Sequence, residues 1–143
     1  MENTAIRSRH VSCLIDASPE AVYAFASTLS NLPLWAAGLA EGNLEQNGDV
    51  VRVDSPMGSV TVRFAPRNEH GILDHDVTLP SGTVAHNPLR VLAHPHGAEV
   101  VFTVRQIELS DEEFERDAQM VAADLQRLKQ AVESVASATS HVQ

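Results

Sequence analysis

The chain is short of several residue types on which common functions depend. It has one cysteine, Cys13, so no internal disulfide can form. Aromatic residues make up 4 % of its 143 residues. Ten Lys and Arg residues stand against 19 Asp and Glu residues, which gives a formal net charge of −9. Such a surface repels phosphate backbones and anionic lipid, so we expect neither nucleic acid nor a membrane surface as a partner.

Long apolar runs are missing too. No segment has the length of apolar sequence that a bilayer requires. Residues 1–6 are polar and lack the apolar stretch of a signal peptide. With the single cysteine, these features predict a cytoplasmic protein without membrane insertion. Hydrophobic residues make up 43 % of the chain, and 143 residues fit one domain with its own core.

Familiar catalytic and cofactor motifs are also absent. The sequence contains no Gly-rich phosphate loop, no G-x-S-x-G and no H-E-x-x-H, and we predict no cofactor. Asp74 and Asp76 stand two apart on one predicted strand and face outward, which makes them poor acid/base partners. His70, His94 and His96 fall in predicted turns at one end and could bind zinc or nickel if they met. No cysteine accompanies them, and we predict no metal site.

The chain starts with a strand followed by a helix. Residues 10–16 have a β-like pattern that directs Cys13 inward as a structural thiol. Ser18 can cap the following helix, Pro19 suits its first position, and Glu20 favours the positive end of the dipole. A second short helix that carries Trp35 is expected after Ser30.

The chain closes with a long amphipathic helix. Ser110 and Glu113 form a capping box at its start. Arg127 and Lys129 fall late in the helix, as its negative end prefers. Apolar residues recur at helical spacing and form one buried stripe: Phe114, Ala118, Val121, Leu125, Leu128, Val132 and Val135.

Between these helices, residues 43–107 read as strands joined by short turns. Short turns imply an antiparallel meander, because parallel strands need long crossovers. Residues 83–93 are one strand candidate, although Pro88 requires a bulge or an edge there. The order of elements therefore predicts an α+β fold.

The tight turn at 80–82 sets a register for the two strands beside it. It places Leu79 near Thr83, which brings Val77 opposite Ala85, His75 opposite Asn87 and Leu73 opposite Leu89, all on the inner face. Asp76 and His86 then face each other on the outer side. A slip of one residue would reverse these faces.

His75 and Asn87 are thus polar groups on an otherwise apolar inner face. A buried polar group needs a partner, because leaving it unpaired costs about 1–3 kcal/mol. One interpretation is that the two residues orient or polarise a ligand carbonyl group. The other is that they satisfy each other, or water, and have only a structural role.

The segment Ile15–Phe25, IDASPEAVYAF, resembles the opening stretch of the START-like (SRPBCC) superfamily. The segment 31–35, NLPLW, is similar to the family's tryptophan-bearing second helix. The resemblance implies a helix-grip fold, in which a curved seven-stranded antiparallel sheet wraps around the long C-terminal helix and two short helices follow the first strand. On this basis, residues 1–8 are a flexible lead-in, 9–136 one START-like domain, and 137–143 a frayed tail.

The similar subgroup, polyketide cyclases and lipid-transport proteins, implies that a small apolar ligand binds between sheet and helix. The alternative is a cyclase or dehydratase acting on a cyclic carbonyl compound, with His75 as general base or acid and Asn87 as carbonyl orienter. A third possibility is an interaction module, such as a homodimer, with a filled core. The expected ligand-lining residues are Phe25, Trp35, Met57, Phe64, His75, Val77, Asn87, Phe102 and Met120.

Overall fold

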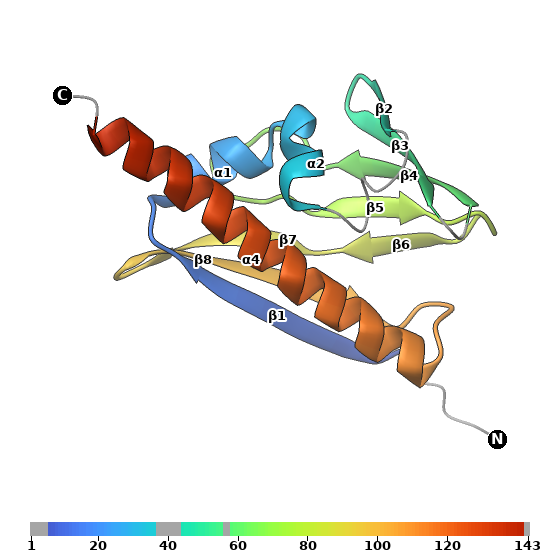
Figure 1. Ribbon diagram of the computed structural model, residues 1–143. Coiled ribbons are helices and arrows are strands. Elements are labelled where there is room, and N and C mark those ends of the chain that lie inside the picture. Colours follow the sequence, from blue (N-terminus) through green and yellow to red (C-terminus); the bar gives the residue numbers. More distant parts are fainter. Residues whose placement is uncertain (1–5, 37–43, 56–57, 142–143) are drawn as a thin grey trace.

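A computed structural model describes residues 6–36, 44–55 and 58–141 (Figure 1). Two short helices follow the first strand: α1 (Pro19–Ala26) and, after a 3-10 turn η1 (Leu29–Asn31), α2 (Leu32–Trp35). The Ser18 hydroxyl accepts a hydrogen bond from Ala21 N, so the predicted cap of α1 is confirmed. The long helix α4 (Asp111–His141) opens with the predicted capping box, in which Ser110 and Glu113 each accept the other's backbone N–H.

The described residues form eight strands, all paired antiparallel, in a three-stranded and a five-stranded sheet. The three-stranded sheet has the order β1-β8-β7, and the five-stranded sheet β2-β3-β4-β5-β6. Their bounds are β1 (Ser8–Ile15), β2 (Leu44–Asn47), β3 (Val50–Ser55), β4 (Gly58–Phe64), β5 (His75–Thr78), β6 (Val84–Asn87), β7 (Leu89–His94) and β8 (Gly97–Arg105). The resemblance to the START-like superfamily had implied seven strands in one sheet.

The extra strand arises at Pro88, where the predicted strand 83–93 divides into β6 and β7. Proline has no N–H to donate to a neighbouring strand. After this break β7 turns to new partners, and Leu73 N donates to Leu89 O and Val91 N to Gly71 O, each at 2.8 Å. The segment 71–73 therefore joins the two sheets into one curved surface.

The Asp74 carboxylate holds the sheet together at this break. It accepts from Leu89 N at 3.0 Å and from two nitrogens of Arg90 at 2.7 Å each. Its side chain is only 13 % exposed. The hydrogen bonds from Arg90 hold the pKa of this carboxyl below its ordinary value. On the same outer face His86 Nδ1 lies 2.7 Å from Asp76, as the register predicted.

We expect Asp74→Asn to lower the free energy of unfolding by about 1–3 kcal/mol at neutral pH. Because the folded pKa of Asp74 lies below the unfolded one, the folded state binds fewer protons. The stabilisation that the Asp74 carboxylate provides is complete above the pKa of about 3.9 that this carboxyl has in the unfolded chain. It is lost as the pH falls from about 3.9 through the lower pKa of the folded protein. Urea denaturation between pH 3 and 7 measures both effects. Asp76→Asn, on a side chain 48 % exposed, is the matched control and should cost under about 0.5 kcal/mol.

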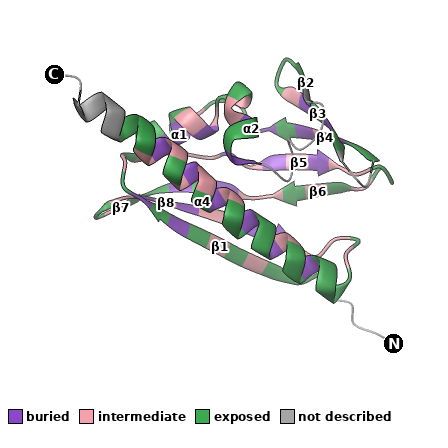
Figure 2. Ribbon diagram, in the orientation of Figure 1, coloured by how far each residue is buried: buried purple, intermediate pink, exposed green. Residues whose placement is uncertain are grey.

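Helix α4 lies across the concave side of the two sheets (Figure 1). Figure 2 shows that its buried residues form one stripe facing the sheets and its exposed residues face outward. The stripe contains Phe114, Ala118, Val121, Leu125, Leu128 and Val132, as predicted, whereas Val135 is exposed. The helix extends to His141, and fraying of residues 137–143 stays a prediction.

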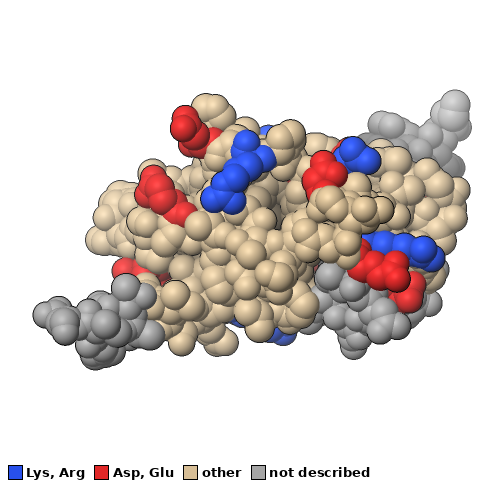
Figure 3. Space-filling model, turned by 90° about the horizontal axis from the view of Figure 1, so that it is seen from above, with Lys and Arg blue, Asp and Glu red and all other residues tan. Residues whose placement is uncertain are grey.

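The surface carries charges of both signs. Acidic and basic side chains lie interspersed among uncharged residues on the face seen in Figure 3. Within the described residues, no helix combines the length and hydropathy needed to cross a membrane.

Candidate functional site

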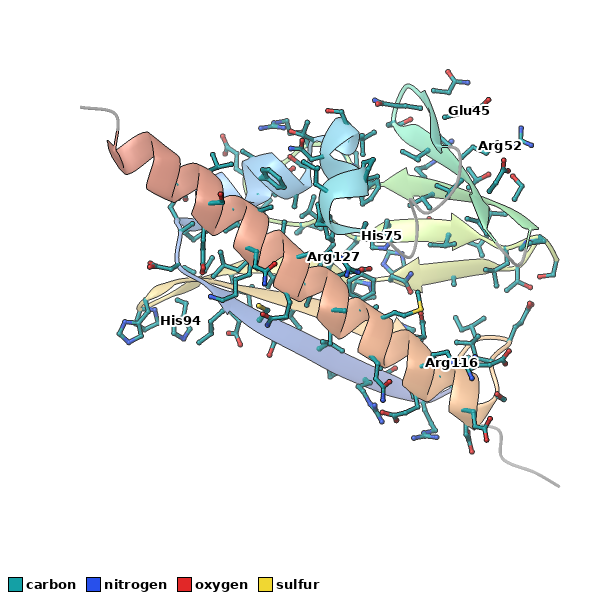
Figure 4. The ribbon with its side chains drawn as sticks, viewed as in Figure 1. Glu45, Arg52, His75, His94, Arg116 and Arg127 are labelled. Atoms are coloured by element: carbon teal, nitrogen blue, oxygen red, sulfur yellow. The ribbon has the colours of Figure 1, made fainter. Side chains whose placement is uncertain are left out.

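His75 occupies the inner face of the five-stranded sheet, where the register predicted it. Its Cα is paired with that of Asn87 and, on the other side, with that of Phe64. His75 is 3 % exposed, and its ring lies between the rings of Phe64 and Phe102, at centroid distances of 5.0 and 5.4 Å. Figure 4 shows it beside β5. The imidazole of His75 and the two phenylalanine rings thus form one continuous aromatic surface, which we call the aromatic wall.

The hydrogen bonding of His75 fixes its chemistry. Its Nδ1 lies 3.0 Å from the Leu73 carbonyl oxygen, which can only accept, so Nδ1 carries the proton. Burial lowers the pKa of the imidazole, and the Leu73 carbonyl only partly offsets this. The ring is therefore neutral at pH 7, and its Nε2 is a lone-pair acceptor.

The other residues that the sequence predicted to line a ligand site differ in how far they are buried. Val77 is buried, one pleat along the same strand, and Asn87 is half-buried opposite His75. Among the described residues, no hydrogen bond to the Asn87 side chain is found, so it does not satisfy His75. Phe25 and Phe102 are partly buried against the core. Met120 is 43 % exposed on α4, and Met57 lies outside the described residues.

Trp35, which the sequence predicted as a ligand-lining residue, is 3 % exposed and belongs to the hydrophobic core. Its helix α2 packs against α4. Its indole Nε1 is nonetheless buried without a hydrogen-bond partner among the residues described. An indole N–H is a donor only, and it usually has a partner when it is buried.

At one end of the molecule the β5–β6 turn lies against the loop before α4 and the start of β4. Ser81 Oγ donates to Glu108 Oε1 at 3.0 Å, and Thr83 Oγ1 also donates to Glu108. The β5–β6 turn is thereby fastened to the loop before α4. A methyl group at Gly58 would lie 3.1 Å from Pro80 Cγ, so the start of β4 adjoins the same turn.

The histidine-bearing turn lies at the opposite end. Figure 4 shows His94 at the β7–β8 turn, well away from His75. The rings of His94 and His96 are 5.7 Å apart, and in the described part of the chain no three His, Cys, Asp or Glu residues are grouped as metal ligands. An open hollow of about 710 Å³ lies there between the residues 14–18, the turn 95–97 and Lys129.

Sequence reasoning missed a polar flank on α4. Arg127 was interpreted as a helix-end cation, but α4 continues 14 residues beyond it to His141, so Arg127 lies within the helix. Its Nη2 donates to Asp124, and its Nε is buried without a partner among the described residues. Asp117, two turns before Asp124, is half-buried, and burial raises the pKa of its carboxyl. The available signal was the position of these charges one residue off the apolar stripe.

Neither a protein-family model nor a curated protein matches the sequence. Solved structures do match. XoxI from Bacillus cereus superposes with a TM-score of 0.65 at 18 % identity, over 92 % of this chain and 98 % of that one. Ara h 8.0201 gives 0.66 at 14 % identity, over 91 % and 99 %. Norcoclaurine synthase from Thalictrum flavum gives 0.64 at 16 % identity, over 92 % and 97 %.

The chain has the helix-grip fold. The architecture implied by the resemblance to the START-like superfamily is thereby confirmed, with eight described strands in place of seven. At identities below one fifth the likeness concerns the fold alone. A fold does not by itself determine a function, so the function must be argued from the residues inside this one.

Proposed function

We propose that this helix-grip protein binds a small hydrophobic molecule between the inner face of the sheets and α4. The observation that carries the proposal is the buried, neutral imidazole of His75 between Phe64 and Phe102, with Nε2 left as an acceptor. Apolar walls with a few polar groups are typical of small-molecule sites. A core whose only task was stability would gain from an apolar residue there.

The experiment uses the uncharged fluorophore N-phenyl-1-naphthylamine as an apolar probe, together with mass spectrometry of the natively purified protein under denaturing conditions. We expect saturable fluorescence enhancement with a Kd in the micromolar range, or an apolar compound released on denaturation. Absence of both, with the protein folded, would contradict the proposal.

The variant that isolates His75 is His75→Phe, which preserves an aromatic ring between the two phenylalanines. We expect it to fold and to bind the probe, because the wall stays apolar. The wild type should lose stability as the pH falls below about 6.5, because the unfolded imidazole takes up a proton that the folded one resists. That loss should be smaller in His75→Phe. Urea denaturation between pH 5 and 8 measures the difference. If the stabilities of the wild type and of His75→Phe depended equally on pH, the conclusion that His75 is neutral in the folded protein would be wrong.

A second candidate function follows from the same ring. A neutral imidazole with an unprotonated Nε2 can act as a general base, and Asn87 opposite could orient a carbonyl group. One protein with this fold is named a synthase, so the fold accommodates enzymes. If this protein is a cyclase or dehydratase, His75→Phe should bind substrate and lose turnover by about 10²–10⁴-fold. Unchanged turnover would exclude His75 as the base.

A further inference from the structure

Two side-chain N–H groups on α2 and α4, which pack together, are buried without a partner among the described residues, although the Arg127 side chain as a whole is 43 % exposed. Across the part of the chain that the structure describes, Trp35 Nε1 and Arg127 Nε are the two buried side-chain nitrogen or oxygen atoms without a hydrogen-bond partner. Both are donors that cannot accept. Buried donors are paired in the great majority of cases, so such a group needs an explanation. Both N–H groups here would be satisfied by the same kind of partner, an oxygen atom that accepts a hydrogen bond.

The two donors belong to elements that pack together. Trp35 ends α2, which packs against α4, and Figure 4 shows Arg127 near the middle of α4. The flank of α4 toward β1 is taken by other residues, since Gln126 Nε2 contacts Cys13 Sγ at 3.5 Å and Glu133 accepts from Asp16 N. Arg127 stands about 200° around the helix from Lys129, whose Nζ pairs with Glu133. Arg127 therefore leaves α4 on the flank away from β1.

The charged side chains on this flank of α4 indicate whether the missing acceptor is a carboxylate or an uncharged oxygen. Asp124 accepts from Arg127 Nη2 and so neutralises the guanidinium. Asp117 lies two turns earlier on the same flank, about 10 Å along the axis. A ligand carboxylate would add a third acid, in a chain whose net charge is already −9. An uncharged acceptor satisfies the two N–H groups without that repulsion.

We infer that Trp35 and Arg127 form a subsite for an uncharged carbonyl oxygen, so that the apolar ligand is a ketone, aldehyde, ester or amide and not a fatty-acid anion. This inference rests on the proposed function, because the subsite has a role only if a ligand enters between the sheets and α4. The apolar body of the ligand lies toward the aromatic wall around His75. Its carbonyl group lies toward α2 and α4.

The test uses ketone and hydrocarbon pairs that differ chiefly in the carbonyl group: cyclohexanone and cyclohexane, 1-tetralone and tetralin, fluorenone and fluorene. Trp35 is the only tryptophan, so a ¹H–¹⁵N correlation spectrum contains a single indole cross-peak. We expect a ketone that binds to move this proton downfield and its hydrocarbon partner to leave it in place. The ketone should bind about tenfold more tightly or better, the effect of one or more hydrogen bonds.

Two variants and a control make the result specific. Trp35→Phe and Arg127→Met should each reduce the advantage of the ketone several-fold and leave the hydrocarbon affinity unchanged. Arg116→Met, at an exposed position on α4, should change neither. Since Trp35→Phe alters the core, Arg127→Met and the wild-type indole shift decide the matter if that variant fails to fold.

The outcomes separate the two proposals. Equal affinity for ketone and hydrocarbon, with an unmoved indole peak, would overturn the carbonyl subsite and leave the proposed function standing. Tighter binding of tetralin-1-carboxylate than of 1-tetralone would overturn the choice of an uncharged oxygen. Failure of every compound to bind the folded protein would overturn both proposals.

Discussion

Replacing Gly71 by alanine is expected to lower the free energy of unfolding by more than about 3 kcal/mol. Gly71 has φ +71°, and a methyl group there would collide with the backbone carbonyl oxygen of Val91. The collision has no easy relief, because Val91 N donates to Gly71 O at 2.8 Å and Val91 is buried. The segment 71–73 leads directly to His75, so the same change should also disturb the candidate site.

Gly48→Ala is the matched control for this prediction. Gly48 has nearly the same dihedral, φ +66°, but nothing within 4 Å of an added methyl group. It should show only the backbone strain of a left-handed alanine, about 1–2 kcal/mol. Urea denaturation of both variants measures the difference. Similar losses in the two would show that the contact between residue 71 and β7 does not hold the sheets together.

Replacing Val77 by phenylalanine is expected to weaken the binding of N-phenyl-1-naphthylamine tenfold or more. Val77 is buried on the inner face of β5, with the small residue Ala85 paired opposite it. A larger ring there occupies space that the ligand needs. Overpacking costs about 1–3 kcal/mol of stability, which leaves a folded protein to measure.

The control for Val77→Phe is Val84→Phe, two residues beyond the turn on an exposed position of β6. This variant should bind the probe as the wild type does. Fluorescence titration of the two variants, each checked for folding by circular dichroism, decides the matter. A folded Val77→Phe protein with unchanged affinity would place the ligand elsewhere than on this wall. Should Val77→Phe not fold, Val77→Met makes the same test with less added volume.

Local signals made much of the fold predictable. The tight turn before Thr83 predicted a register that a slip of one residue would have reversed, and the structure has that register, with His75 opposite Asn87 and Asp76 opposite His86. Residues three apart in sequence formed the predicted capping box at Ser110. In these cases the determining contacts lie close together along the chain, and a pattern of residue types suffices.

The features that the sequence did not show depend on contacts between distant segments. The strand break at Pro88 was expected only as a bulge or an edge, because the pairing of β7 with residues 71–73 and the bonds from Asp74 cannot be read from spacing. The N–H groups of Trp35 and Arg127, unpaired among the described residues, are also invisible in sequence, because their burial depends on how distant segments pack in the folded protein. A tryptophan and an arginine 92 positions apart have no detectable relation until the chain is folded.

The central claim is that the space between the His75 face of the sheets and α4 accepts an apolar molecule. The most direct measurement is a crystal structure under xenon pressure, because xenon enters apolar cavities and needs no knowledge of the natural ligand. We predict a xenon peak between the sheet and α4, in contact with the rings of Phe64, His75 and Phe102. Well-diffracting crystals with xenon only in the hollow beside Lys129, or with none, would contradict the account.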